Sequence, residues 1–321
     1  WGVDMSEIEK QNSLDVDVFT GTELLAEPPE EVPYVINPLI PSNGITLLSG
    51  EPGIGKTAFG WGLGQAMANG EEFLGHATKA GNVLYLSLDM TRGQIKHRIH
   101  KTGFAPKFKF ISYAPYVNCL SGTFRGSLLY RTVQSELAVG NYQLVIIDAL
   151  VELIGSSLNE DNVPSQVKSI LKEWIPNIPV LILHHTRKRK YANGYVIPAT
   201  GEQSSGSQFW RGLCCSHLIF DSTNVKHKII LKHDKSQIDE KADDLEVFVD
   251  FSTSTIKLWT EYKAQSEQSR LAGYIEQAKK KHQGWDTLAK EQQKRIVMEI
   301  SGRGRSTVAE LFRKAALLEA K

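Results

Sequence analysis

Short apolar runs alternate with segments of helical periodicity between residues 45 and 183. The runs are continuously apolar, which is typical of strands that are buried on both faces of a sheet. The segments between them place apolar side chains three or four residues apart, as at Ile95 and Ile99, and this spacing predicts helices. The order predicts an α/β fold with a mainly parallel twisted sheet flanked by helices. The expected strands are residues 45–48, 83–88, 108–113, 144–147 and 180–183, and the expected helices are 58–69, 91–101, 128–139 and 163–174.

The pattern changes after residue 186. Residues 187–208 are rich in Lys, Arg, Gly and Ser and predict a long exposed loop. β-like runs follow at 218–220, 228–231, 245–251 and 255–259, and we expect them to extend the sheet with antiparallel strands. From residue 264 the chain is locally basic, with 12 Lys or Arg against 7 Asp or Glu. This last region predicts helices with a break at 301–305.

The bulk composition limits the kind of protein. The 321 residues carry a net charge of +1, so any surface for nucleic acid must be local. The three cysteines show no CxxC or zinc spacing, which favours a reducing compartment. No apolar run reaches the ~18 residues that suggest a membrane span. We therefore expect no membrane partner and a cytoplasmic location.

A glycine-rich sequence after the first expected strand, from Gly50 to Thr57, matches the phosphate-binding pattern GxxxxGK(S/T). Glycines let the backbone wrap tightly with its N–H groups inward, and the following helix turns its positive end to the phosphates. Lys56 is expected to reach the β- and γ-phosphates of ATP, and the Thr57 hydroxyl to bind Mg²⁺. The residues expected to contact the nucleotide are Gly50, Glu51, Pro52, Gly53, Ile54, Gly55, Lys56, Thr57 and Ala58.

A second nucleotide motif lies at the end of the fourth expected strand. Leu144 to Ile147 are apolar, and Asp148 follows them. In P-loop proteins a carboxylate in this place holds Mg²⁺, so Asp148 joins Thr57 as an expected metal ligand. Buried strands also end in Asp without any function. The motif gains its meaning from lying downstream of the phosphate loop.

Two further strand ends carry a family resemblance. A strand end and helix of the DnaB-type and hexameric RepA helicases resemble Leu-Ser-Leu-Asp-Met at 86–90, with Arg98 nine residues after Asp89. A strand end of the RepA branch resembles Leu-Ile-Leu-His-His-Thr-Arg-Lys at 181–188. With the two nucleotide motifs, the likeness spans about residues 35–260. It implies a RecA-type P-loop ATPase core.

The resemblance implies roles for two of these residues. Asp89 occupies the position whose acidic residue polarises the attacking water, and Asp stands here where Glu is usual. His184 occupies the position that senses the γ-phosphate, and a neutral imidazole can donate a hydrogen bond to a phosphate oxygen. The alternatives are a carboxylate that only caps a strand and a buried structural histidine.

The resemblance also implies a cation supplied by a neighbour, because RecA-type rings place the active site between subunits. Arg211 is the first candidate, since it follows a Gly-Ser-rich loop as the RepA finger does. Lys232 and Lys235 are the second, since the DnaB finger strand resembles residues 229–234, although Asp234 stands where its Arg should be. A solvated surface role is the alternative for each cation. The expected catalytic residues are Lys56, Asp89, Asp148, His184 and Arg211.

Two basic segments are candidates for contact with nucleic acid. The first follows the expected sensor strand directly, and in the resembled family this loop grips single-stranded DNA in the ring channel. The second lies in a Gly-rich turn before Ser306, an expected helix N-cap, in the outline of a helix-turn-helix. The alternatives are a basic loop without a partner and a tail that docks on a neighbouring subunit. The residues expected to bind nucleic acid are Arg187, Lys188, Arg189, Lys190, Arg303 and Arg305.

The sequence therefore predicts an ATP- and Mg²⁺-dependent ATPase that acts on DNA. The leading hypothesis is a ring, expected to be a hexamer, that works as a helicase-like motor on single-stranded DNA in plasmid, phage or mobile-element replication. The alternatives are an ATP-switched recombination or loading protein of RecA or KaiC type without unwinding, and a regulator whose tail reads a DNA sequence. The expected parts are a flexible segment with a proline-rich linker at 1–34, the RecA-like core at 35–263 and a basic helical tail at 264–321.

Overall fold

The computed structural model describes residues 19–26, 33–113, 118–154, 162–186, 191–192, 195–196, 208–282 and 284–319, in two units. The first unit is Trp1–Val32, whose described part contains the short exposed helix α2 (Gly21–Ala26). The second unit is Pro33–Lys321 and contains every other described helix and strand. All of the nucleotide motifs lie in this second unit.

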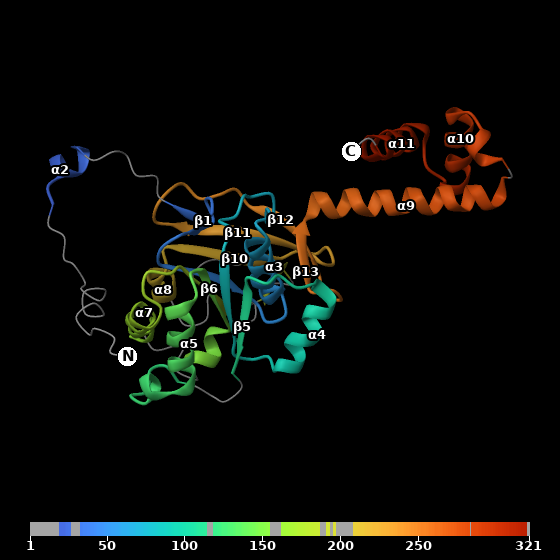
Figure 1. Cartoon of the computed structure of the whole chain (residues 1–321). Helices are drawn as coiled ribbons and strands as arrows, with labels where there is room; N and C mark the ends of the chain where they lie inside the picture. The colour runs from blue at the N-terminus through green and yellow to red at the C-terminus, as the bar shows by residue number, and fades with distance from the viewer. Residues whose placement is uncertain are drawn as a thin grey trace. The chain divides into compact units, whose positions relative to one another are not determined.

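A nine-stranded sheet, in the order β13-β12-β11-β10-β3-β7-β6-β4-β5, forms the centre of the second unit (Figure 1). The six strands from β10 to β5 run parallel, and β11, β12 and β13 continue the sheet as antiparallel strands. This topology confirms the expected fold class and its antiparallel extension. The strands are β3 (Ile45–Gly50), β4 (Asn82–Ser87), β5 (Phe108–Ser112), β6 (Tyr142–Asp148), β7 (Val180–His185), β10 (Ser216–Ser222), β11 (Lys228–Ser236), β12 (Leu245–Asp250) and β13 (Thr255–Leu258).

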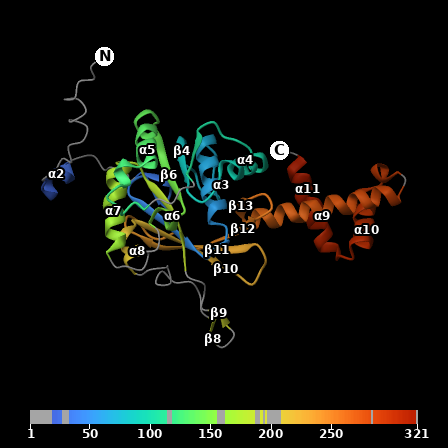
Figure 2. The ribbon, with the colours of Figure 1, turned by 90° about the horizontal axis from the view of Figure 1, so that it is seen from below.

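Helices cover both faces of the sheet (Figure 2). Successive residues of a strand point to opposite faces, so Leu48 packs with residues of α3 and α4, whereas Leu47 packs with residues of α5, α6, α7 and α8. This two-sided burial explains why the strands are continuously apolar in sequence. The helices are α3 (Lys56–Asn69), α4 (Arg92–Thr102), α5 (Leu128–Val139), α6 (Leu150–Ile154), α7 (Val163–Trp174) and α8 (Gln208–Leu213).

Two element boundaries differ from the expectation in ways that affect the site. Helix α3 begins at Lys56 rather than at residue 58, because Gly55 precedes it as an N-cap in the left-handed region, at φ 114°. Strand β7 continues to His185, two residues beyond its expected end. Both the phosphate-loop lysine and the two adjacent histidines therefore belong to regular elements of secondary structure.

Smaller elements lie outside the main sheet. Strands β1 (Tyr34–Ile36) and β2 (Ile40–Pro41) form an antiparallel pair before β3. Strands β8 (Tyr191–Ala192) and β9 (Tyr195–Val196) form another within the segment that the sequence predicted as a loop. That prediction missed the pair, because strands of two residues have no readable periodicity.

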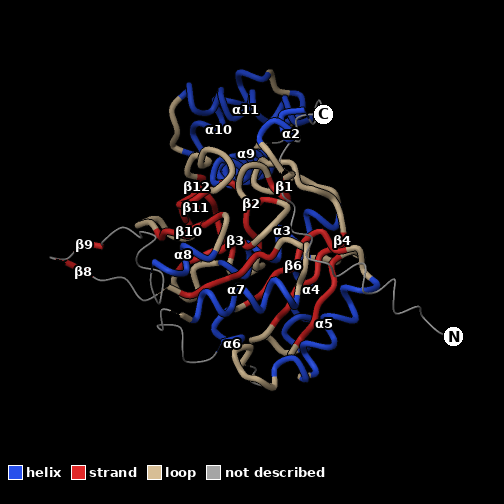
Figure 3. Tube along the Cα trace, turned by 90° about the vertical axis from the view of Figure 1, so that its left-hand side faces the viewer, coloured by secondary structure: helices blue, strands red, loops and turns tan. Residues whose placement is uncertain are grey.

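The C-terminal region is helical, as expected, and consists of α9 (Trp259–Lys281), α10 (Lys290–Ser301) and α11 (Arg305–Glu319) (Figure 3). Helix α9 runs without interruption across residue 263, and α10 begins at Lys290 after a short 3₁₀ turn. Ser306 lies inside α11 rather than at its N-cap, since the helix begins one residue earlier. In the described part of the chain, no helix combines the length and apolar character that crossing a membrane requires.

Candidate nucleotide-binding site

The glycine-rich loop connects the end of β3 to the start of α3. Gly53 and Gly55 both have left-handed backbone, at φ 75° and 114°, which L side chains rarely adopt. A Cβ atom on Gly55 would also lie 2.9 Å from Val249 Cγ1. The loop therefore requires glycine at this position both for its backbone angles and for the close approach of β12.

Lys56 is buried and its ammonium group is held against the loop itself. Its Nζ atom donates hydrogen bonds to the carbonyl oxygens of Gly50 and Glu51, both at 2.8 Å. Burial lowers the pKa of Lys56 to about 8, although the charges of Asp148 and Glu51 act in the opposite direction. The side chain remains mainly charged at neutral pH and is already directed to the cradle of the loop.

Asp148 ends β6 and is almost fully buried, with 2% of its surface exposed. Its Oδ2 atom accepts a hydrogen bond of 2.5 Å from the hydroxyl of Tyr85 on the neighbouring strand β4. Burial first, and then the charge of Asp148, raise the pKa of Tyr85, so that this phenol stays a donor. Such an outer partner fixes the orientation of a carboxylate that ligates a metal.

Asp89 and Arg98 lie at the edge of the site on the side of α4. With Thr57 they line a cavity of about 460 Å³. Partial burial, and next the charge of Asp148, raise the pKa of Asp89 to about 6, while Arg98 acts to lower it. The Arg98 guanidinium lies over the ring of Trp61, 5.3 Å from the ring centroid. Its Nη1 atom is buried and has no hydrogen-bond partner among the described residues.

The two adjacent histidines of β7 point to opposite faces of the sheet. His184, the expected sensor, is fully buried, and its ring lies 5.5 Å from that of Trp210 on α8. His185 points to the face of α3 and, with Lys56 and Thr57, lines a second cavity of about 230 Å³. Since side chains alternate along a strand, only one of the pair can face the phosphate loop. The structure places His185 there, whereas His184, the expected sensor, lies on the opposite face.

His185 has the properties of a phosphate contact. It is half-buried, and its Nδ1 atom is buried without a hydrogen-bond partner among the described residues. Burial, and next the charge of Lys56, lower the pKa of His185 below its usual value of 6.5. The ring is therefore neutral at pH 7 and has one N–H donor.

The turn between β12 and β13 closes the same cavity from the side of the sheet extension. Asp250, Phe251 and Ser254 line it beside the phosphate loop. Lys101 of α4 donates a hydrogen bond of 2.9 Å to the carbonyl of Ser252 and so ties this turn to the opposite wall. Phe251 is 50% exposed. The sequence pattern assigned Phe251 to the end of the expected strand 245–251, whereas β12 ends at Asp250 and Phe251 begins the turn.

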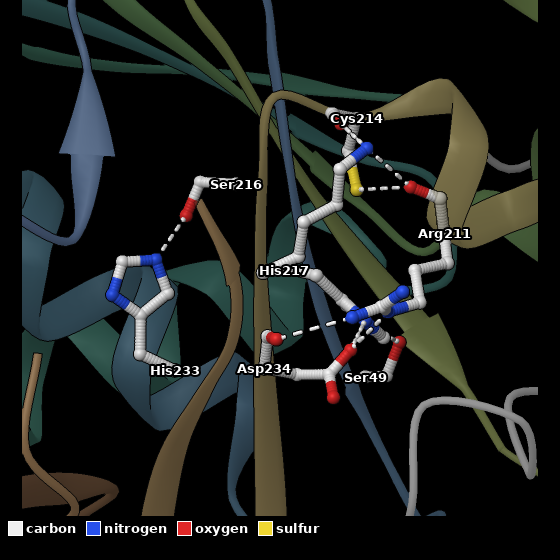
Figure 4. A network of polar contacts seen from close by, with 8 residues as sticks. Ser49, Arg211, Cys214, Ser216, His217, His233 and Asp234 are labelled. Carbon is white, nitrogen blue, oxygen red and sulfur yellow. Dashed lines mark hydrogen bonds and ion pairs between the residues drawn. The ribbon is translucent and has the colours of Figure 1, made fainter. Parts of the chain in front are cut away.

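The three cations expected to act in a neighbour's site all have partners inside the chain. Arg211 Nε lies 2.7 Å from Asp234 Oδ2, and Arg211 Nη2 donates to the Asp234 carbonyl at 3.3 Å (Figure 4). Lys235 donates to the carbonyls of Arg211 and Cys214, at 2.8 and 2.7 Å. Lys232 pairs with Asp221 at 2.7 Å. Asp234, which stands where the DnaB finger strand has its arginine, thus binds Arg211, the first candidate, directly.

The contact between Arg211 and Asp234 continues into the core (Figure 4). Asp234 Oδ2 lies 3.0 Å from His217 Nδ1, and His217 Nε2 lies 2.9 Å from Ser49 Oγ, the residue before Gly50. Hydrogen bonds from His217 and Arg211 lower the pKa of Asp234 to about 2. Because the ionised Asp234 can only accept, His217 Nδ1 donates the hydrogen bond between them. We call Ser49, His217, Asp234 and Arg211 the polar chain.

The residues expected to bind nucleic acid lie in different parts of the molecule. Arg187, Lys188, Arg189 and Lys190 fall outside the described residues. Arg303 lies in the turn between α10 and α11 and is half-buried. Arg305, the first residue of α11, is exposed and lies 3.5 Å from Glu291.

Comparisons with known proteins agree with this architecture. A family model described as an AAA domain matches residues 12–190, more than half of the chain. No curated protein matches the chain. Among solved structures, the chain is similar to a DnaB-like replicative helicase studied with primase, at 14% identity and a TM-score of 0.54, over 79% of this chain and 70% of that one. It is also similar to a KaiC-like protein from the archaeon Pyrococcus horikoshii OT3, at 13% identity and a TM-score of 0.49, over 70% and 93% of the two chains.

Proposed function

The chain belongs to the AAA domain family and has a RecA-type P-loop ATPase fold related to that of DnaB-type helicases, and from this premise we propose that it hydrolyses ATP to act on single-stranded DNA. One observation carries the proposal. The phosphate loop shares its cavity with Arg98 and His185, and each of these side chains has a buried nitrogen without a hydrogen-bond partner among the described residues. Buried polar nitrogens without a partner are costly unless a ligand satisfies them.

The donors around the loop suit a polyphosphate. Lys56, Arg98 and the neutral His185 converge on one cavity from α3, α4 and β7. Left-handed glycines and the N-terminus of α3 add backbone N–H groups at the same place. Thr57 and Asp148 would hold Mg²⁺, which supplies charge neutralisation at the β- and γ-phosphates when it is bound. Phe251 offers its ring to the base of the nucleotide.

Asp89 is the group proposed to activate the attacking water. Its pKa of about 6 leaves it ionised at pH 7 and able to accept a proton near the operating pH. Arg98 lies beside it in the same cavity and favours the ionised form. The side chain of Asp is one methylene shorter than that of the usual Glu, so we expect slow hydrolysis.

Two parts of the proposal concern partners. A ring, proposed to be a hexamer as the RepA and DnaB resemblance implies, would bring Arg211 of one copy to the γ-phosphate of the next. The basic run Arg187 to Lys190 follows β7 two residues after His185 and would bind the phosphates of single-stranded DNA. A change at His185 during hydrolysis would then pass directly into this run.

A second function, an ATP-dependent switch without unwinding, is favoured by one specific observation. Arg211 is bound to Asp234 within its own chain, and Asp234 occupies the place of the finger arginine. A neighbour's γ-phosphate would have to compete with Asp234 for this guanidinium. Hydrolysis would then depend on assembly of the copies. Bound ATP would act as a switch between assembly states rather than as fuel for movement on DNA.

ATP hydrolysis with and without single-stranded DNA, measured beside unwinding of a forked duplex, tests the proposal. Stimulation by DNA with unwinding supports the motor. ATP binding with slow, unstimulated hydrolysis supports the switch. Lys56→Ala is the matched control and should remove nucleotide-dependent activity in either case. Unchanged nucleotide-dependent activity in Lys56→Ala would contradict the assignment of the phosphate loop as the nucleotide site.

A further inference from the structure

The last three helices have a hydrophobic core of their own. Val297 of α10 and Val308 of α11 are fully buried against Leu271 and Ala278 of α9 and against Trp285. None of these residues belongs to the two clusters that cover the sheet. The C-terminal half of α9, with α10 and α11, is thus a three-helix bundle whose geometry is set by its own contacts. We call it the tail bundle.

The connection between α10 and α11 is a tight turn of three residues. Gly302 follows α10 with a left-handed backbone at φ 66°, and its N–H donates to the carbonyl of Met298 at 2.9 Å. Helix α11 begins at Arg305, and the N–H of Val308 bonds to the carbonyl of Gly304 at 3.1 Å. Two helices joined by a turn of three or four residues with glycine, braced by a preceding helix, are the outline of the helix-turn-helix.

The outward side of α11 carries polar groups that can read base edges. Ser306, Glu310 and Arg313 are exposed and lie four and three residues apart, while Val308 and Phe312 belong to the core of the bundle. A hydroxyl, a carboxylate and a guanidinium are the group types that pair with bases in the major groove. The face presented by the first turns of α11 is therefore chemically varied rather than uniformly basic.

The charge around this face is positive. Between residues 303 and 313 there are three Arg and one Glu. Arg303 and Arg305 flank the turn at the start of α11, where a helix-turn-helix contacts the phosphate backbone beside the bases. A docking surface for protein would need apolar anchors. Among the side chains that the structure describes in the tail bundle, no large hydrophobic one is exposed.

We propose that the tail bundle binds duplex DNA in a sequence-dependent manner, with the first turns of α11 in the major groove. Arg303 and Arg305 contact phosphates, and Ser306 and Glu310 contact base edges. This site is distinct from the nucleotide cavity and from the basic run at 187–190. It would direct the ATPase to a particular duplex sequence, and it does not depend on whether ATP is fuel or switch.

The test uses the full chain and fluorescence anisotropy. Duplexes selected from a random library by the wild-type protein are compared with random duplexes and with single strands of the same length. Arg303→Gln with Arg305→Gln is expected to weaken binding to the selected duplex by about 10-fold or more and to reduce the salt dependence by about two phosphate contacts. The matched control is Lys279→Gln with Lys280→Gln, which removes the same charge from α9, where both lysines already pair with Asp286 and Glu276. The control is expected to change the affinity by less than about 3-fold.

A second variant separates recognition of base edges from electrostatic attraction to phosphates. Ser306→Ala, which removes no charge, should change which sequence the library selects while it leaves the salt dependence unaltered. ATP hydrolysis stimulated by single strands should be the same in all of these variants, which distinguishes failure of this site from failure of the ATPase. The proposal is overturned if selection yields no duplex bound better than random duplex, if the α9 control weakens binding as much as the α11 variant, or if both variants bind as the wild type does.

Discussion

Replacement of each of the two adjacent histidines of β7 is the sharpest test of the nucleotide site. His185 lines the cavity of the phosphate loop, whereas His184 lies in the core on the opposite face against Trp210. His185→Ala should therefore impair the chemistry and leave the fold intact. His184→Ala should destabilise the fold and impair the chemistry only through unfolding.

The expected magnitudes differ in kind. Loss of a hydrogen bond to a charged phosphate costs about 1.5–3 kcal/mol, which corresponds to a loss of about 10- to 150-fold in kcat/KM for ATP. His185 is half-buried and its Nδ1 has no protein partner among the described residues, so its removal breaks no internal hydrogen bond of that atom. Truncation of the fully buried His184 leaves a cavity beside Trp210 and should cost about 2–4 kcal/mol of unfolding free energy.

The assay pairs single-turnover ATP hydrolysis with urea unfolding, both at a temperature where each variant is folded. His185→Asn, which keeps an N–H donor, should recover part of the lost rate. The pKa of His185 lies below its usual value, so the rate of the wild type should not require a protonated imidazole at pH 7. The reasoning is refuted if folded His184→Ala protein loses hydrolysis while His185→Ala retains it.

Four further results are expected. Lys56→Ala should abolish ATP binding measured by calorimetry; tight binding by this variant would place the phosphates elsewhere. Because the pKa of Asp89 is raised to about 6 and its carboxylate is the proposed base, kcat/KM should fall as the pH drops through about 6, and Asp89→Asn should bind ATP without hydrolysing it. Phe251→Ala should weaken ATP binding by about 1–3 kcal/mol, the value of one stacked base, and should leave the binding of inorganic triphosphate unchanged. Phe251→Trp is the control that keeps an aromatic ring, and equal losses of affinity for both ligands would exclude stacking. Asp234→Asn should increase hydrolysis at protein concentrations that favour assembly if Arg211 acts in trans, and a rate independent of this change would remove Arg211 from the site.

The sheet and the phosphate loop could be predicted because each has a local signal. Continuous apolar runs identify strands buried on two faces, and the pattern from Gly50 to Thr57 is written in adjacent residues. The helices 128–139 and 163–174 were expected with the bounds that the structure shows. In these cases the local preference and the tertiary environment favour the same conformation.

Other parts of the site could not be read from local patterns. The sequence His184-His185 contains both candidates for the sensor, and the choice depends on which face of β7 carries α3. Choosing between them requires the pairing of β7 with β3, in which Leu48 lies opposite Leu183 and Gly50 lies opposite His185. The sequence does not contain this pairing. Phe251 reaches the cavity only because β12 and β13 lie beside α3, which is a contact between residues about 200 positions apart.

A β-bulge explains the contact that the sequence least suggested. His217 pairs with Lys235 and Leu218 with His233, so Asp234 is an extra residue in β11. A bulge redirects a side chain, and here it brings Asp234 to the same face as His217 and Arg211. In the sequence, Asp234 is visible only as a residue that stands where the DnaB finger strand has its arginine. Its contact with Arg211 could not be predicted, because a bulge shifts the alternation of side chains along a strand and no residue pattern marks it.

The polar chain also bears on the choice between motor and switch. Asp234, with a pKa of about 2, stays ionised at every physiological pH, so its pair with Arg211 does not depend on titration. Arg211 is 47% exposed, and pairs of this kind contribute only about 0–1 kcal/mol. The γ-phosphate of a neighbouring copy carries more charge than one carboxylate and would displace Asp234 once the copies assemble. Ser49 ties the other end of the polar chain to the strand that leads into the phosphate loop. If Arg211 exchanged Asp234 for a neighbour's γ-phosphate, the change would therefore reach the nucleotide site of its own subunit through Ser49. Both the motor and the switch require such coupling between sites.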